Sequence, residues 1–152
     1  MMEEKEKAWK TVSSKYLFRR PWLTVRCEDM LLPNGNHIPE YYILEYPDWV
    51  NTIAITKDGK FVFVRQYRPG LGRTSYELCA GVCDKEDASP LVSAQRELWE
   101  ETGYGKGNWQ EYMVISANPS THTNLTHCFL ATDVEPIDHQ HLEDTEDLSV
   151  HL

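Results

Sequence analysis

The sequence predicts an α+β fold, of the mixed α/β kind, in a chain of 152 residues. Three observations point to this class: strand-like runs joined by tight-turn signals, one amphipathic helical stretch between strands, and no internal repeat. Apolar residues make up 41% of the chain and charged residues 26%, which is typical of a domain with a packed core. The composition therefore argues against a disordered chain.

Two hairpins are predicted in the first half of the chain. Residues 16–46 read as strands on either side of the turn signal PNGN, which predicts an antiparallel pair. The runs VNTIAIT and FVFVRQYR, residues 50–56 and 61–68, flank an Asp-Gly pair that favours a tight turn between antiparallel strands. We expect one further strand at SYELCAGV, residues 75–82.

A helix is predicted to begin at Pro90. Ser89 is a good N-cap, because its hydroxyl accepts a hydrogen bond from a free backbone amide, and proline suits the first helical position. Gly103 supplies a helix stop. Between these ends the apolar residues recur at the three- and four-residue spacing of one helix face, at Leu91, Ala94 and Leu98.

Strand patterns return after the helix. Residues 109–116 and 127–134 read as two more strands. The tail, residues 142–152, begins acidic and ends with strand-like alternation. A helix placed between strands, together with several hairpins, predicts a mixed sheet.

Charge and cysteine usage restrict the partners and the compartment. Acidic residues outnumber basic residues 24 to 15, and the net charge of -9 argues against a nucleic acid or an anionic membrane as the main partner. The N-terminal stretch MMEEKEKAWK is too charged for a signal peptide or an anchor, and no later apolar run is long enough to cross a bilayer. The four cysteines show no CxxC spacing, which predicts a reduced, cytoplasmic setting.

Three glutamates lie on one stripe of the predicted helix. Glu100 and Glu101 follow Glu97 by three and four residues, so the three carboxylates project from neighbouring points and repel one another. A bound divalent cation turns this repulsion into attraction, and hard oxygen ligands suit Mg²⁺ or Mn²⁺. A solvated acidic face is the alternative explanation of an ExxEE pattern.

The stretch GVCDKEDASPLVSAQRELWEETGY resembles the Nudix box, whose pattern is GX5EX7REUXEEXGU with U a bulky apolar residue. Its second half, which begins at Arg96, matches at every fixed position. The first half differs, because Gly81 lies fifteen residues before Arg96 instead of fourteen and Ala88 stands where the pattern has its first glutamate. A one-residue insertion lets Glu86 or Asp87 take the place of that glutamate.

The resemblance implies a Nudix fold: a mixed β-sheet sandwiched by helices, preceded by an N-terminal antiparallel β subdomain. We expect residues 1–50 to form that subdomain and residues 51–152 to form the catalytic domain, without the further C-terminal helix of the family. The first part often exchanges between two subunits in this branch, which implies a homodimer. Its aromatic residues hold the base in the family, and the candidates, for which a core or dimer role stays open, are Trp22, Tyr41 and Tyr42.

The same resemblance implies a metal centre that binds Mg²⁺, with Mn²⁺ as the alternative ion. Arg96 orients the glutamates, and Gly81 and Gly103 are structural residues of the box. The implied ligands are the carboxylates of three glutamates and one backbone carbonyl, from Glu97, Glu100, Glu101 and Ala80.

The segment before the box resembles the branch of ADP-ribose and nucleotide-sugar pyrophosphatases. Arg65, Arg68 and Glu77 match its VRQYR and ExxAG positions and are the expected substrate contacts, although an exposed strand charge remains the alternative for Arg65. Pro119 stands fifteen residues after Tyr104, as a proline does in the ADP-ribose-hydrolysing branch.

The resemblance implies hydrolysis of the pyrophosphate bond of ADP-ribose or a related nucleoside diphosphate sugar. Other substrates, such as GDP-mannose or NADH, and a non-catalytic sensor of nucleotide sugars are the alternatives. The general base is expected in the acidic segment LEDTED, at Glu143 or Glu146, unless Glu97 or Glu100 itself activates water.

Overall fold

The computed structural model describes residues 7–152 and divides into two compact units. Of the described residues, the first unit comprises 7–46 with Ser116–Asn124, and the second comprises Pro47–Ile115 with Leu125–Leu152. Residues 1–6, which carry most of the charged N-terminal stretch predicted to be neither signal nor anchor, lie outside the described residues. Within residues 7–152, no helix is long and apolar enough to cross a membrane.

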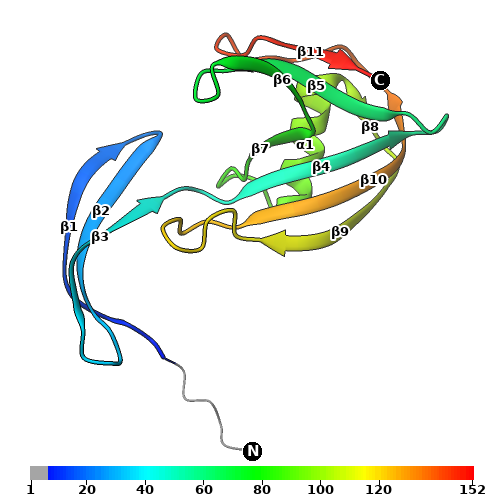
Figure 1. The fold of residues 1–152 in the computed structure, drawn as a ribbon. Helices are drawn as coiled ribbons and strands as arrows, with labels where there is room; N and C mark the ends of the chain where they lie inside the picture. The colour runs from blue at the N-terminus through cyan, green and yellow to red at the C-terminus, as the bar shows by residue number, and fades with distance from the viewer. Residues whose placement is uncertain (1–6) are drawn as a thin grey trace, which may run out of the picture. The chain divides into compact units, whose positions relative to one another are not determined.

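The first unit is a three-stranded antiparallel sheet in the order β1-β2-β3 (Figure 1). Its strands are β1 (Lys10–Arg20), β2 (Leu23–Leu31) and β3 (His37–Glu45). The predicted turn is present, because Gly35 adopts a positive φ of 88° and its N–H donates to the Leu32 carbonyl at 2.9 Å. The N-terminal antiparallel sheet is thus confirmed.

The second unit is a mixed sheet in the order β11-β5-β4-β10-β8, with β6 on β5, β7 on β4 and β9 on β10 (Figure 1). The pair β4–β10 is parallel and the others are antiparallel. The elements are β4 (Trp49–Thr56), β5 (Phe61–Arg68), β6 (Arg73–Glu77), β7 (Cys79–Val82), α1 (Pro90–Thr102), β8 (Tyr104–Gly105), β9 (Asn108–Ile115), β10 (Thr126–Pro136) and β11 (Leu148–His151).

One edge of β4 is shared by two strands. Since β10 pairs along the whole of β4, both β5 and β7 pair on its other edge: β5 at Ala54 and Ile55, and β7 from Trp49 to Thr52. The run 75–82, predicted as one strand, is therefore two strands, because β6 pairs with β5 whereas β7 pairs with β4. The single-strand prediction was wrong at this point.

The helix α1 agrees with the predicted caps. The side chain of Ser89 accepts a hydrogen bond from the Val92 N–H, and Gly103 adopts a left-handed φ of 73° while its N–H donates to the Trp99 carbonyl. The buried side of α1 packs on the sheet, where Leu98 joins a core with Ala54, Val62, Cys79, Ala131 and Val134, and Ala94 joins Val50 and Phe129. Leu91, predicted on the same face, is 37% exposed.

Candidate active site

Arg96 holds two of the predicted metal ligands from one nitrogen. Its Nη1 donates to Glu97 Oε1 at 3.0 Å and to Glu100 Oε2 at 2.9 Å, so both carboxylates are turned to the same side of α1. Partial burial opposes the positive charge, but the hydrogen bond to Asp87 and the neighbouring carboxylates raise the pKa of Arg96 above its ordinary value. Arg96 therefore remains a guanidinium that orients the acidic residues around it.

The loop before α1 is fastened to the same arginine. Arg96 Nη2 donates to the Val82 carbonyl at 3.0 Å, and its Nε and Nη2 both reach Asp87 Oδ2, at 3.2 and 3.1 Å. Asp87 is half-buried, whereas Glu86 is exposed. Of the two candidates for the missing box glutamate, Asp87 is the one that contacts Arg96.

Glu97 lies beneath the backbone of β7. Its Oε1 accepts from the Val82 N–H at 3.2 Å, and its carboxylate occupies the space where a side chain at Gly81 would begin. Burial raises the pKa of Glu97, while the charge of Arg96 opposes this shift. The glycine of the box is thus needed for close approach between strand and helix.

Glu101 is the most buried of the three glutamates, at 5% exposure. Its Oε2 accepts from the Ala80 N–H at 3.3 Å. Burial raises the pKa of Glu101 to about 7; the hydrogen bond from Cys79 works in the opposite direction and the Glu97 charge adds to the rise. Glu101 is therefore an acid whose negative charge is costly without a cation.

The donor set fits a hard divalent cation. Glu97, Glu100 and Glu101 contribute carboxylate oxygens, and Ala80 adds a backbone carbonyl on the adjoining strand; Mg²⁺ and Mn²⁺ prefer such oxygens. Among the described residues, the three carboxylates do not all lie within 4.8 Å of one another. Arg96 holds two of them, and Glu101 is bonded to β7.

A cavity of about 460 Å³ adjoins Glu101. Glu101, Ala80 and residues 66–68 of β5, including Arg68, form part of its wall, and the acidic segment before β11 supplies the rest, including Glu146. Glu143 is not among the lining residues, and its backbone N–H donates to Glu146 Oε2 at 2.9 Å. Of the two predicted bases, Glu146 therefore lies beside the metal-ligand candidates.

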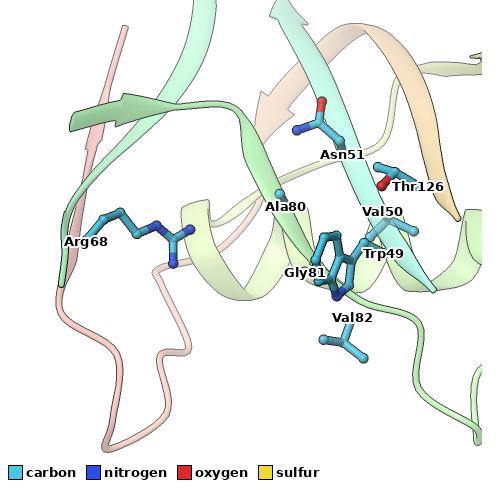
Figure 2. A pocket seen from close by; sticks show the side chains of 8 residues that line it. All are labelled: Trp49, Val50, Asn51, Arg68, Ala80, Gly81, Val82 and Thr126. Atoms are coloured by element: carbon cyan, nitrogen blue, oxygen red, sulfur yellow. The ribbon is translucent and has the colours of Figure 1, made fainter. Parts of the chain in front are cut away.

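A second cavity, of about 420 Å³, lies along β4 and β7 (Figure 2). Trp49, Asn51 and Thr126 line it on one side, and it shares Arg68 and Ala80 with the first cavity. The two cavities thus meet at these two residues. Both volumes are in the usual range for small-molecule sites.

The two predicted arginines of β5 differ in position. Arg68 Nε and Nη2 form a forked pair with Glu77 on β6, with Nη2 2.7 Å from Oε2, and this pair lowers the pKa of Glu77. Arg65 lines neither cavity and lies 5.8 Å from the Tyr76 ring centroid. The position of Arg65 thus favours the alternative that it is an exposed strand charge.

The remaining predicted residues lie in the first unit or at a helix end. Pro119 belongs to the segment Ser116–Asn124 of the first unit, as do the aromatic candidates of the N-terminal sheet. Tyr41 donates to the Ser120 carbonyl and stacks edge-on with Trp9, whereas Trp22 is 72% exposed and Tyr42 44%. Gly103 caps α1.

Sequence reasoning missed the residues of the second cavity. Trp49 and Asn51 alternate with the buried Val50 and Thr52 along β4, so they point away from the core. The run VNTIAIT predicted a strand, but which of its faces borders a cavity depends on the position of β7. Cys79, whose thiol bonds to Glu101, was equally without a local signal.

Two family models cover most of the chain. Residues 9–44 match the nucleoside diphosphate sugar hydrolase N-terminal domain, and residues 46–151 match the NUDIX domain. A structure described as an ADP compounds hydrolase superposes with a TM-score of 0.81 at 23% identity, covering 94% of this chain and 76% of that one. This likeness shows the fold.

Curated relatives point in the same direction. The ADP-ribose pyrophosphatase of Bacillus subtilis (strain 168) is 32% identical over 129 residues, which are 85% of this chain and 69% of that protein. The ADP-ribose pyrophosphatase of Mycobacterium tuberculosis is 28% identical, over 87% of this chain and 63% of that protein. The methanol dehydrogenase activator of Bacillus methanolicus is 33% identical, over 80% of this chain and 65% of that protein. The chain thus spans about two thirds of the length of these relatives.

The matched family models and the arrangement around Arg96 agree on one assignment. The chain belongs to the Nudix hydrolase family, in the branch of the ADP-ribose pyrophosphatases.

Proposed function

We propose that this protein is a Mg²⁺-dependent pyrophosphohydrolase acting on ADP-ribose or a related nucleoside diphosphate sugar, with a nucleoside monophosphate and a sugar phosphate as products. The observation that carries the proposal is the cavity that adjoins Glu101 and meets a second cavity at Arg68 and Ala80. The names of the relatives from Bacillus subtilis and Mycobacterium tuberculosis support the choice of substrate.

The two adjoining cavities suit a substrate with two ends joined by a diphosphate. Arg68 is a planar, permanently charged donor at their junction, which matches phosphate oxygens. Trp49 and Asn51 offer an aromatic surface and an amide to one end of the substrate. The forked contact with Glu77 keeps the Arg68 side chain extended toward that junction.

The glutamates of α1 and the Ala80 carbonyl are the proposed ligands. When bound, Mg²⁺ neutralises charge on phosphate oxygens and lowers the pKa of water. Glu101 holds the buried position, and Glu97 and Glu100 are kept in place by Arg96. Members of the family generally use divalent metal ions, which supports this assignment.

Glu146 is the proposed general base. It lines the cavity beside Glu101, so it can take a proton from a water in that space. Glu143, the second candidate, contacts Glu146 through its backbone and lies outside the lining. Glu97 and Glu100 are the remaining alternatives, and both already accept a hydrogen bond from Arg96.

The test is product release from ADP-ribose, GDP-mannose and NADH, each with Mg²⁺ and with EDTA. We expect metal-dependent cleavage of ADP-ribose, and loss of turnover in Glu101→Gln. Glu86→Gln is the matched control, because it removes an exposed carboxylate in the loop before α1. If only another compound in the panel is cleaved, that compound replaces ADP-ribose as the proposed substrate. Tight nucleotide-sugar binding without cleavage indicates a sensor.

We further propose a homodimer and a cytoplasmic location. The N-terminal sheet exposes large apolar side chains, including Phe18 at 55% and Trp22 at 72%, which suits burial against a second copy. All four cysteines are free, which suits a reducing compartment. Sedimentation equilibrium tests the dimer, and a single monomeric species contradicts it.

A further inference from the structure

Three metal-binding side chains meet in the loop after β10. Asp138, His139 and His141 each offer one ligand atom, and these atoms all lie within 4.8 Å of one another. Asp138 Oδ1 lies 2.7 Å from His139 Nδ1, and its Oδ2 lies 3.0 Å from His141 Nε2. One carboxylate thus brings two imidazoles to the same place, and we call these three residues the DHH cluster.

The DHH cluster is fastened to the C-terminal end of α1. The Asp138 N–H donates to the Gly103 carbonyl at 3.1 Å, and the His141 N–H donates to the Glu100 carbonyl at 2.8 Å. The His141 ring also stacks on Trp99, with ring centroids 4.2 Å apart at 30°. Asp138 and His139 remain exposed, so the cluster is both positioned and accessible to an ion.

The local charge favours a cation. The last turn of α1 contains no basic residue, and the carbonyl groups at the end of a helix carry partial negative charge. Asp138 adds a full negative charge beside them, in a chain whose net charge is -9. A divalent ion at the DHH cluster therefore offsets charge that no lysine or arginine of this turn balances.

We propose that the DHH cluster binds a divalent cation of the Zn²⁺ class, at a site separate from the glutamates of the box. Two imidazole nitrogens and one carboxylate are a ligand set for Zn²⁺, Ni²⁺ or Cu²⁺, with further positions left to water. Mg²⁺ prefers oxygen ligands, which the box glutamates supply. The two sites thus differ in the metal that each selects.

Calorimetric titration of the full chain with Zn²⁺, in the presence of excess Mg²⁺, tests the proposal. We expect one Zn²⁺ per chain, and affinity weakened by about tenfold or more in the double variant His139→Ala and His141→Ala. His37→Ala is the matched control. His37 also pairs with a carboxylate, Asp29 at 3.1 Å, but within residues 7–152 it belongs to no group of three metal-binding side chains. It should bind Zn²⁺ like the wild type.

Glu101→Gln distinguishes the two metal sites. It removes a proposed Mg²⁺ ligand and should leave the Zn²⁺ titration unchanged. If the double variant has an altered circular dichroism spectrum, the single variant His139→Ala carries the test, because that side chain is 79% exposed. No Zn²⁺ binding by the wild type, or equal binding by wild type and the histidine variants, overturns the proposal.

Discussion

The carboxylate of Glu97 occupies the place of a side chain at Gly81: a Cβ built on Gly81 would lie 2.0 Å from Glu97 Cδ and 2.2 Å from its Oε1. Even the smallest substitution must therefore displace this glutamate from β7. The glycine is fixed by the close approach of strand and helix, since its φ lies outside the left-handed region.

Gly81→Ala is expected to lower kcat by about tenfold or more, because Glu97 must leave its bond to the Val82 N–H. Steady-state kinetics with ADP-ribose over a Mg²⁺ series measure the effect. Gly70→Ala is the matched control, because a Cβ there meets nothing within 4 Å and its φ is not positive. Equal kinetics for the two variants would show that Glu97 moves without consequence.

Asp87→Asn is expected to destabilise the fold by about 1–2 kcal/mol, because Arg96 loses the charge of a half-buried carboxylate that accepts from its Nε and Nη2. Urea unfolding measures the difference. Glu86→Gln, which changes an exposed carboxylate next to it, should leave the midpoint unchanged. The opposite result would assign the role of the missing box glutamate to Glu86.

Stability of the metal-free protein is expected to fall between pH 5 and pH 8. Glu101 has a pKa of about 7 in the folded protein, above the ordinary value of 4.5, so the unfolded chain ionises first as the pH rises. The stabilising contribution of the neutral Glu101 carboxyl is complete below about pH 4.5 and is lost as the pH passes 7. The free energy of unfolding then falls by an amount on the order of 3 kcal/mol. Denaturant titrations in EDTA at both pH values should show a smaller drop for Glu101→Gln; parallel profiles would contradict the assignment.

Arg68→Lys is expected to raise KM for ADP-ribose by about tenfold, because lysine lacks the planar fork that contacts Glu77 and suits phosphate. Arg65→Lys on the same strand is the control, since Arg65 lines neither cavity. Initial rates as a function of substrate concentration distinguish them. A larger effect at Arg65 would place the diphosphate on the other face of β5.

Glu146→Gln is expected to lower kcat by about 10²- to 10⁴-fold with little change in KM, as expected for removal of a general base. Glu143→Gln should retain most of the activity, because its side chain lies outside the cavity lining. A pH–rate profile for each variant shows whether the acidic limb, where protonation of the base stops the reaction, has been lost. Equal, small effects would leave Glu97 or Glu100 as the base.

Local patterns predicted the helix, because its caps and apolar spacing are carried by residues adjacent in sequence. The orienting role of Arg96 was implied by the resemblance to the Nudix box. The break between the two strands at Leu78 was not predictable, since it arises because β6 pairs with β5 while β7 pairs with β4. The choice of Asp87 over Glu86 depends on which side chain the loop turns toward Arg96. The histidines of the DHH cluster gave no signal, because their convergence requires the loop to rest on α1.

The acidic segment 142–147 is attached to the fold at both of its ends. On one side, His141 and Gln140 are hydrogen-bonded to the carbonyl groups of Glu100 and Glu101; on the other, β11 pairs with β5. Glu146, in this span, lines the cavity beside Glu101. The position of the proposed base thus depends on how β11 pairs with β5, and not only on the helix that carries the metal ligands.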